Sequence, residues 1–258
     1  MSLDLAKVTA FVESHIGEFH DKRLASIDSL KLEKLLLRKN PYLFRAKHLV
    51  IPQDLVRSLL DAHLSSHEET IFGDFLESLA IFINGECFGG RKSSTEGIDL
   101  EFDKDSTRYL VSIKSGSNWG NSSQIKKMRD NFKTAAKIVR KRNPATHVVA
   151  VNGCCYGREG SPDKGDYRKY CGQSFWEFVS GSPTLYTDII EPLGHRAKER
   201  NDDFIARYAD VWNRFTQEFM TAYCSEGRLR WDAFVRLNSS NEKPQRSSVK
   251  AKTGKRHS

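Results

Sequence analysis

Two strand-like runs joined by a short polar break constrain the fold of this chain more than any other feature. The first run is Gly97–Phe102 (Gly-Ile-Asp-Leu-Glu-Phe), and the second is Tyr109–Gly116 (Tyr-Leu-Val-Ser-Ile-Lys-Ser-Gly). Polar and apolar residues alternate in both runs, as in strands with one buried face. The pattern predicts a hairpin that closes in a two-residue turn at Asp105-Ser106. A longer loop over Lys104–Thr107 would keep the same register.

This register gathers charged side chains on one face of the hairpin. Asp99 and Glu101 share a face of the first run, and Ser112 and Lys114 share a face of the second. The two-residue turn places Asp99 opposite Ser112 and two residues from Lys114. Hydrolysis of a phosphodiester needs a carboxylate that holds a divalent cation and an ammonium group that supports the attacking hydroxide. The alternative is an ordinary surface hairpin whose aspartate and lysine face solvent.

A basic amphipathic helix and an apolar strand follow the hairpin. The helix is expected from about Ser123 to Arg140, with a cap from Asn121 or Ser122. The strand is expected at His147–Asn152. A strand, a helix and a strand in this order predict a right-handed crossover, and therefore a mixed sheet in an α/β fold.

Helical patterns flank this core on both sides. They cover residues 3–20, 22–39, 53–64, 71–83, 175–179, 185–198 and 202–224. We therefore expect four regions. These are an N-terminal helical region at 1–65, a catalytic core at 66–174, a C-terminal helical region at 175–238 with apolar surface for a dimer interface, and a disordered basic tail at 239–258.

The side chains available as metal ligands favour a hard cation. The five cysteines form no C-x-x-C pair, and the eight histidines show no zinc-ligand spacing, so a zinc site is not expected. The cysteines are expected to be reduced structural thiols. Mg²⁺ is the expected ion at the hairpin, because it binds oxygen and needs only one or two carboxylates besides water and substrate phosphate.

The positive charge of the chain is concentrated near its end. The net charge is +8, and Ser239–Ser258 contributes six Lys or Arg residues against one acid, a net +5. Such a tail can add non-specific affinity for phosphate, or it can serve as a solubilising end. The sequence has no run of 18 apolar residues and no signal-peptide pattern, so we expect a cytoplasmic protein without a membrane partner.

Four stretches in order carry a more specific pattern: Lys39–Lys47, Glu68–Glu77, Gly97–Asp99 and Ile113–Asn121. Together they resemble the PmeII-type family of type II restriction endonucleases, within the PD-(D/E)xK nuclease superfamily. The resemblance implies an α/β fold with a restriction-endonuclease-like mixed β-sheet core, flanked by helices and by further N- and C-terminal helical layers. It also implies cleavage of double-stranded DNA at a short sequence with Mg²⁺, by a homodimer whose system includes a DNA methyltransferase.

The resemblance also assigns roles to residues of the hairpin. Asp99 would be a metal ligand, Lys114 the catalytic lysine, and the carbonyl of Ile113 a further metal ligand. Ser112 stands where the superfamily usually has Asp or Glu. A second acidic ligand is therefore expected from elsewhere in the chain.

Three residues are candidates for this second acid. Some restriction enzymes of the superfamily take it from a neighbouring helix, and Glu77 lies in the helical pattern that precedes the hairpin. Asp130 lies on the helix after the lysine strand, and Glu101 shares the face of Asp99. Glu77 ranks first because the first helix of the fold commonly presents a glutamate. A solvated helix glutamate is the alternative reading of Glu77.

Polar and basic residues after the catalytic lysine are candidates for DNA contacts. Asparagine and glutamine can bind adenine, and basic side chains can bind phosphate or guanine. The alternative is a solvated basic surface. The candidates lie in the loop after Lys114, on the following helix and in the expected loop 153–172: Asn118, Trp119, Asn121, Ser122, Gln124, Lys126, Lys127, Arg158 and Arg168.

Two other functions remain open from the sequence. A junction-resolving or repair nuclease with the same core would prefer branched DNA. A DNA-binding protein with a decayed active site is the other alternative, because Ser112 replaces an acid.

Overall fold

The computed structural model describes residues 3–241, and these divide into two compact units. Among the described residues, the sheet unit combines 3–27 with 65–207, and the helical unit combines 28–64 with 208–241. Each unit is thus built from two separate stretches, whereas the four predicted regions follow one another along the chain. Residues 242–258 of the predicted basic tail lie outside the described residues.

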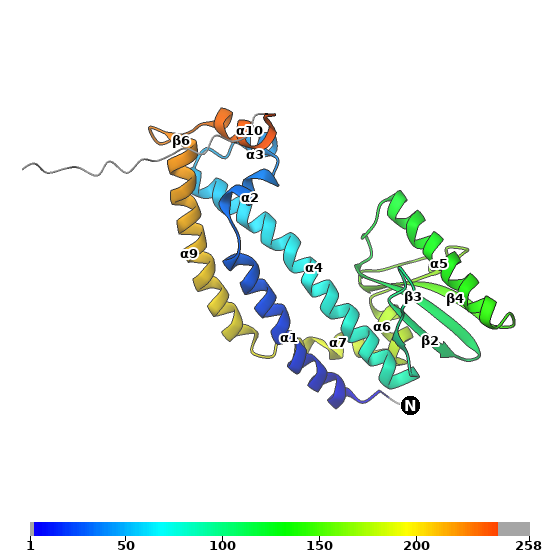
Figure 1. The fold of residues 1–258 in the computed structure, drawn as a ribbon. Helices are drawn as coiled ribbons and strands as arrows, with labels where there is room; N and C mark the ends of the chain where they lie inside the picture. Colours follow the sequence, from blue (N-terminus) through cyan, green and yellow to red (C-terminus); the bar gives the residue numbers. More distant parts are fainter. Residues whose placement is uncertain (1–2, 242–258) are drawn as a thin grey trace, which may run out of the picture. The chain divides into compact units, whose positions relative to one another are not determined.

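Within the described part of the sheet unit, five strands form one mixed sheet in the order β1-β2-β3-β4-β5. The pairs β1–β2 and β2–β3 are antiparallel, whereas β3–β4 and β4–β5 are parallel. This arrangement confirms the predicted α/β fold with a mixed sheet (Figure 1). The strands are β1 Arg91–Lys92, β2 Leu100–Lys104, β3 Thr107–Gly116, β4 His147–Tyr156 and β5 Arg168–Cys171.

The β2–β3 hairpin has the predicted turn and register. Asp105 and Ser106 form the two-residue turn with positive φ angles of 49° and 59°, as a type I′ turn requires. Lys104 pairs with Thr107, and the ladder continues in step to the pair of Leu100 with Val111. The regular ladder ends there, because the backbone N–H of Asp99 also turns to the carbonyl oxygen of Val111, at 2.8 Å. The predicted backbone pairing of Asp99 with Ser112 is therefore not formed, and these two residues meet through their side chains.

Helix α5 (Ser122–Arg142) covers one face of the sheet. Its buried residues Met128, Phe132 and Ala135 pack against Leu110 of β3. The helix was predicted at Ser123–Arg140, and the structure extends it slightly at both ends. Its connection between β3 and the parallel strand β4 is the expected crossover.

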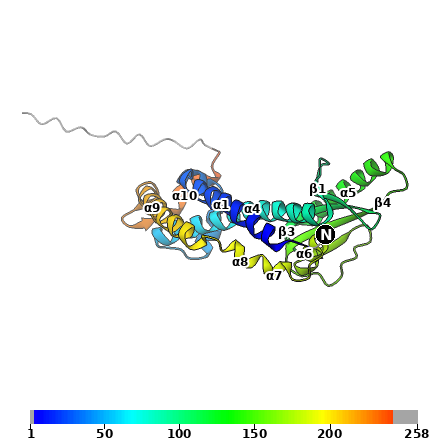
Figure 2. The same cartoon turned by 90° about the horizontal axis from the view of Figure 1, so that it is seen from below.

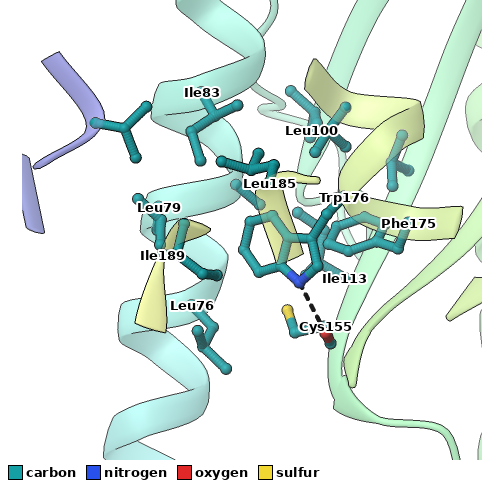
Figure 3. Packing of buried hydrophobic residues seen from close by; sticks show 14 of the residues in the cluster. Leu76, Leu79, Ile83, Leu100, Ile113, Cys155, Phe175, Trp176, Leu185 and Ile189 are labelled. Carbon is teal, nitrogen blue, oxygen red and sulfur yellow. Dashed lines mark hydrogen bonds between the residues drawn. The ribbon is translucent and has the colours of Figure 1, made fainter. Parts of the chain in front are cut away.

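Helices α4 (Pro52–Phe88) and α6 (Gln173–Ser180) pack on the other face, so that α5 and α6 lie on opposite sides of the sheet (Figures 1 and 2). Leu79 and Ile83 of α4 are fully buried in this core. The indole of Trp176 on α6 donates a hydrogen bond of 2.8 Å to the carbonyl oxygen of Cys155 (Figure 3). This core fixes the position of α4 relative to β3 and β4.

The prediction of two separate helices at 53–64 and 71–83 is wrong, because α4 runs unbroken through both. In the structure Gly73 lies inside α4, where a Cβ atom would be 3.4 Å from the Cβ of Ser115. Helix α4 therefore lies directly against β3 at this point.

The expected loop at 153–172 is also partly wrong. Strand β4 continues to Tyr156, and β5 occupies Arg168–Cys171. Strand β5 lies at the edge of the sheet with only one neighbour, and an edge strand tolerates exposed charged residues. Its basic residues therefore break the apolar alternation by which a strand is recognised in the sequence.

The remaining elements depart from the predicted helix ends by several residues. The helices expected at 3–20 and 22–39 become α1 and α2, and the one expected at 185–198 becomes two short helices. Within residues 3–241, no helix is long and apolar enough to cross a membrane. All five cysteines are free thiols, as predicted. The elements are α1 Leu5–Asp28, α2 Leu32–Leu37, α3 Pro41–Ala46, α7 Leu185–Asp188, α8 Ile190–Leu193, α9 Ala197–Tyr223, β6 Cys224–Ser225, β7 Arg228–Leu229 and α10 Trp231–Ser239.

Candidate active site

The carboxylate of Asp99 is fixed at the point where β2 meets β3. Its Oδ2 accepts a hydrogen bond of 2.6 Å from the backbone N–H of Ile113 and one of 3.4 Å from the hydroxyl of Ser112. The Nζ of Lys114 lies 3.7 Å from the same oxygen. The side chains of Asp99 and Lys114 are 22% and 32% exposed. The structure therefore brings together the aspartate, serine and lysine of the predicted motif on one face.

Glu77 on α4 lies within electrostatic reach of this pair. Burial raises the pKa of the Glu77 carboxyl above its ordinary value, and the negative charge of Asp99 raises it further. The positive charges of Lys92 and Lys114 act in the opposite direction. The Nζ of Lys92 donates a hydrogen bond of 3.3 Å to Oε1 of Glu77. A carboxylate of a neighbouring helix thus stands beside the motif, where Ser112 had left an acid missing.

The other two candidate acids have different surroundings. The carboxylate of Glu101 is held by two arginines, with Arg91 Nη2 at 2.8 Å and Arg108 Nη1 at 4.0 Å. Asp130 is exposed on α5, and its backbone carbonyl accepts the hydroxyl of Thr134. An acid held by two arginines is a poor metal ligand, because the cations already neutralise it.

The oxygen atoms around Asp99 fit Mg²⁺. No group of three or more His, Cys, Asp or Glu side chains within residues 3–241 is arranged to hold a metal ion. Mg²⁺ needs fewer, because it keeps several waters and is usually bound by one or two carboxylates. In an antiparallel ladder the N–H and C=O of one residue point to the same neighbouring strand. The carbonyl of Ile113 therefore points to the edge where its N–H meets Asp99, and Glu77 would supply the second carboxylate.

Two of the predicted DNA contacts form the cap of α5. The side-chain oxygen of Asn121 accepts from the backbone N–H of Gln124, and the side-chain oxygen of Gln124 accepts from the backbone N–H of Asn121. This reciprocal pair is a capping box, which satisfies free donors at the helix start. Both side-chain oxygens are therefore occupied within the chain.

Trp119 is turned toward the inside of the site. Its indole N–H donates a hydrogen bond of 3.1 Å to Oδ1 of Asn152, and its ring centre lies 5.5 Å from Nζ of Lys114. The residue is half-buried and packs with the core beneath α5. The sequence had suggested a DNA contact for this tryptophan, whereas the structure shows that it contacts the lysine of the motif.

The remaining candidates lie on the surface of the sheet unit. Lys127 is within 3.7 Å of Glu96, and Arg168 is within 2.7 Å of Asp163. These ion pairs are exposed, so each contributes little to stability and can exchange for a phosphate. Four further candidates are exposed: Asn118, Ser122, Lys126 and Arg158.

Two residues of this neighbourhood escaped the sequence analysis. Asn152 is buried in β4 directly opposite Ser112, and an asparagine at the end of an apolar run is a signal that could have found it. Lys92 precedes the hairpin in the short strand β1. Its approach to Glu77 depends on the fold, and no spacing in the sequence indicates it.

The residues thus assembled suit hydrolysis of a phosphodiester. Two carboxylates and a carbonyl can hold a hard cation, and an ammonium group next to them can stabilise a hydroxide or a developing anionic oxygen. The fold places these groups on rigid elements, namely the β2–β3 hairpin and the long helix α4.

Comparison with known proteins assigns the chain to a family. A family model described as type II restriction endonuclease EcoO109I matches residues 6–201. A search of curated proteins finds no match. The predicted resemblance to type II restriction endonucleases is confirmed, but the finer assignment to the PmeII type is not supported. Because the match covers more than half of the sequence, the chain belongs to the type II restriction endonuclease EcoO109I family, and this membership implies site-specific deoxyribonuclease activity.

Proposed function

We propose that this protein cleaves double-stranded DNA at a short specific sequence by Mg²⁺-dependent hydrolysis, with Asp99, Glu77 and Lys114 as its catalytic groups. The observation that carries the proposal is the distance of 3.7 Å between Lys114 Nζ and Asp99 Oδ2, with Glu77 close enough for Asp99 to raise its pKa. The family of the chain supplies the class of substrate. The PD-(D/E)xK motif supplies the division of roles.

Asp99 and Glu77 would hold the metal ion, together with the carbonyl of Ile113. A bound Mg²⁺ supplies a Lewis acid for the phosphoryl oxygen and makes water more acidic. The fit is favourable because Glu77 and Asp99 repel each other, and this repulsion contributes to the raised pKa of Glu77. A divalent cation between them would remove that repulsion.

Lys114 would donate a hydrogen bond to the attacking water as it loses a proton. Its ammonium group lies beside Asp99, with Nζ 3.7 Å from Oδ2. A fixed cation there stabilises negative charge at the moment when charge develops.

Ser112 would orient Asp99 and would not ligate the metal. Its side chain is buried, with 2% exposure of the residue, and its hydroxyl points to Oδ2 of Asp99 at 3.4 Å. A hydroxyl donor there helps to hold the carboxylate in one orientation. The motif position that usually carries an acid thus becomes a support for the remaining one.

DNA would approach the sheet unit along the loop after β3 and the basic face of α5. The exposed candidates Asn118, Ser122, Lys126 and Arg158 would contact phosphates or base edges. A homodimer would present two such sites to a symmetric sequence. A DNA methyltransferase of the same system would protect the host DNA in the cytoplasm.

Incubation of the purified full chain with plasmid DNA tests this function. Discrete fragments are expected with Mg²⁺, and none with EDTA. Cleavage confined to branched DNA would instead favour the junction-resolving nuclease. Binding without cleavage in any divalent cation would favour the decayed site.

Point variants test the site itself. Asp99→Ala, Lys114→Ala and Glu77→Gln are each expected to reduce cleavage at least about 100-fold, because each removes a charged catalytic group. The matched controls Glu101→Gln and Asp130→Asn remove one carboxylate each and should leave cleavage within about threefold of the wild type. An inactive Glu101→Gln beside an active Glu77→Gln would move the second acid to Glu101.

A further inference from the structure

A buried asparagine lies directly behind the candidate site. Asn152 of β4 is 1% exposed and pairs in register with Ser112 of β3. Its amide Nδ2 donates a hydrogen bond of 3.2 Å to the carbonyl oxygen of Ser112. Its Oδ1 accepts the hydrogen bond from the indole of Trp119. A buried amide is costly unless both its donor and its acceptor find partners, and here both do.

The first of these bonds fixes the strand that carries the lysine. Asn152 binds the C=O of the peptide group between Ser112 and Ile113, and Asp99 accepts from the N–H of the same group at 2.6 Å. Hydrogen bonds at both ends of one peptide group polarise it in the same sense and strengthen each other. Lys114 is the next residue after Ile113, so the two hydrogen bonds fix the backbone from which the lysine side chain extends.

The second bond fixes the tryptophan that faces the lysine. An indole has a single donor, and in Trp119 that donor is used by Asn152. The ring is thereby oriented with its centre 5.5 Å from Nζ of Lys114. An aromatic face attracts an ammonium group through its quadrupole. The ring thus limits the positions that the lysine head can adopt beside Asp99.

The loop that carries Trp119 is anchored on both flanks. On one side, Nζ of Lys169 donates a hydrogen bond of 3.0 Å to the carbonyl oxygen of Ser117. On the other side, Asn121 forms the cap of α5. A tryptophan on a loop that is held at both ends can hold a neighbouring group in place, because the loop itself moves little.

We infer that Asn152 and Trp119 are positioning residues for Lys114, which they hold beside Asp99 in the geometry that cleavage requires. The inference rests on the proposed catalytic role of Lys114. It also gives Trp119 a role inside the site, in place of stacking on a DNA base. Neither residue touches the reacting atoms, so both act through the lysine.

The test separates the rate of cleavage from the affinity for DNA. The variants are Trp119→Phe, which keeps an aromatic face but removes the indole donor, and Asn152→Ala, which removes both hydrogen bonds. Single-turnover cleavage is measured with Mg²⁺ on a DNA fragment that the wild type cuts. Binding of the same fragment is measured with Ca²⁺ in place of Mg²⁺. Both variants are expected to lower the rate about tenfold, with affinity within about twofold of the wild type.

A double variant and a matched control sharpen the result. Because both residues act through one chain of contacts, Trp119→Phe/Asn152→Ala should cleave no more slowly than the slower single variant. Trp212→Phe is the control, because Trp212 also donates its indole N–H, at 3.2 Å to the Gln53 carbonyl, and lies 5.4 Å from the Arg57 guanidinium, but in the helical unit. Its cleavage rate should equal that of the wild type.

Three outcomes would overturn the inference. Weaker DNA binding with an unchanged rate in Trp119→Phe would make the tryptophan a DNA contact. An unchanged rate in both single variants would show that neither positions the lysine. An equal loss of rate in Trp212→Phe would indicate general destabilisation. If Asn152→Ala does not fold, Trp119→Phe alone decides between these outcomes. Full cleavage by Lys114→Ala is a different failure, because it would remove the proposed function itself.

Discussion

The hydrogen bond from the Ile113 amide to Asp99 offers a quantitative test of the site, through two substitutions of one residue. Asp99→Asn removes the negative charge but keeps a side-chain oxygen that can accept the bond. Asp99→Ala removes both the charge and the acceptor. Both variants lose the attraction to Lys114 and the repulsion with Glu77, so these electrostatic effects cancel when the two variants are compared. The difference between them isolates the hydrogen bond.

The structure sets the size of this difference. The Ile113 amide lies in a residue that is 3% exposed, and its distance to Oδ2 of Asp99 is 2.6 Å. A buried donor left without a partner costs about 1–3 kcal/mol. The bond from the Ser112 hydroxyl is long, at 3.4 Å, and adds little. We therefore expect Asp99→Ala to be less stable than Asp99→Asn by about 1–2 kcal/mol.

Amide hydrogen exchange followed at Ile113 measures the effect locally, which matters because the two units need not unfold together. A difference of about 1.4 kcal/mol corresponds to about tenfold faster exchange in Asp99→Ala than in Asp99→Asn. Both variants should be inactive in cleavage, since neither carries the carboxylate. Equal exchange in the two variants would show that the bond is not formed. Wild-type cleavage by Asp99→Asn would refute the metal-ligand role.

Three further substitutions test the turn, the sheet core and the charge of the site. Ser106→Gly should raise the free energy of unfolding by about 0.5 kcal/mol in urea denaturation without changing cleavage, because the residue has a φ of 59°. Gly153→Ala should lower it by about 1–3 kcal/mol, since the new Cβ would lie 2.2 Å from the Phe175 ring, whereas Gly160→Ala meets nothing within 4 Å and should be neutral. Burial and a nearby carboxylate raise the pKa of Glu77 in the folded state above its value in the unfolded chain. The folded state therefore holds the Glu77 proton more tightly, and the stability that this proton provides is present below the unfolded pKa and is lost as pH rises through the folded pKa. Metal-free Glu77→Gln should therefore be more stable than the wild type at about pH 8, with the difference vanishing toward about pH 4; a constant difference in urea denaturation would contradict this.

The β2–β3 hairpin could be predicted because its signals are local. Alternation of period two sets the faces, and a two-residue turn sets the register, so the position of Asp99 relative to Lys114 followed from the sequence. Helix α5 was predicted nearly to its ends for the same reason, since its cap at Asn121 and its apolar stripe lie within the helix. These elements carry the motif, and this is why the candidate site could be located before the structure.

Helix α4 and strand β5 could not be predicted because distant parts of the chain decide them. Local patterns predict separate helices at 53–64 and 71–83, whereas α4 runs through both ranges and lies against Ser115 of β3 at Gly73. The backbone of β5 pairs with β4, and this pairing overrides a polar composition around Lys169 that is typical of a loop. Tertiary packing won over local propensity in both cases.

The residues around Lys114 could likewise not be predicted from the sequence. Asn152 reaches Ser112 only through the parallel register of β3 and β4, which are joined by the whole of α5. Lys92 reaches Glu77 only because β1 and α4 meet in the folded unit. A sequence motif identifies the residues that act in catalysis, whereas the residues that position them come together only when the strands pair.

The serine in the motif is consistent with the balance of charge in this site. Ser112 is 2% exposed and its hydroxyl lies 3.4 Å from Oδ2 of Asp99, so a carboxylate in its place would add a buried negative charge beside that oxygen, which has Lys114 Nζ at 3.7 Å. Without a bound cation, two such charges repel each other, and each raises the pKa of the other. Glu77 places the second carboxylate on α4, where burial and the charge of Asp99 raise its pKa and the positive charges of Lys92 and Lys114 offset part of that rise. An acid on the helix instead of the strand therefore keeps two carboxylates near Lys114 and adds Lys92 as a second cation that compensates their charge.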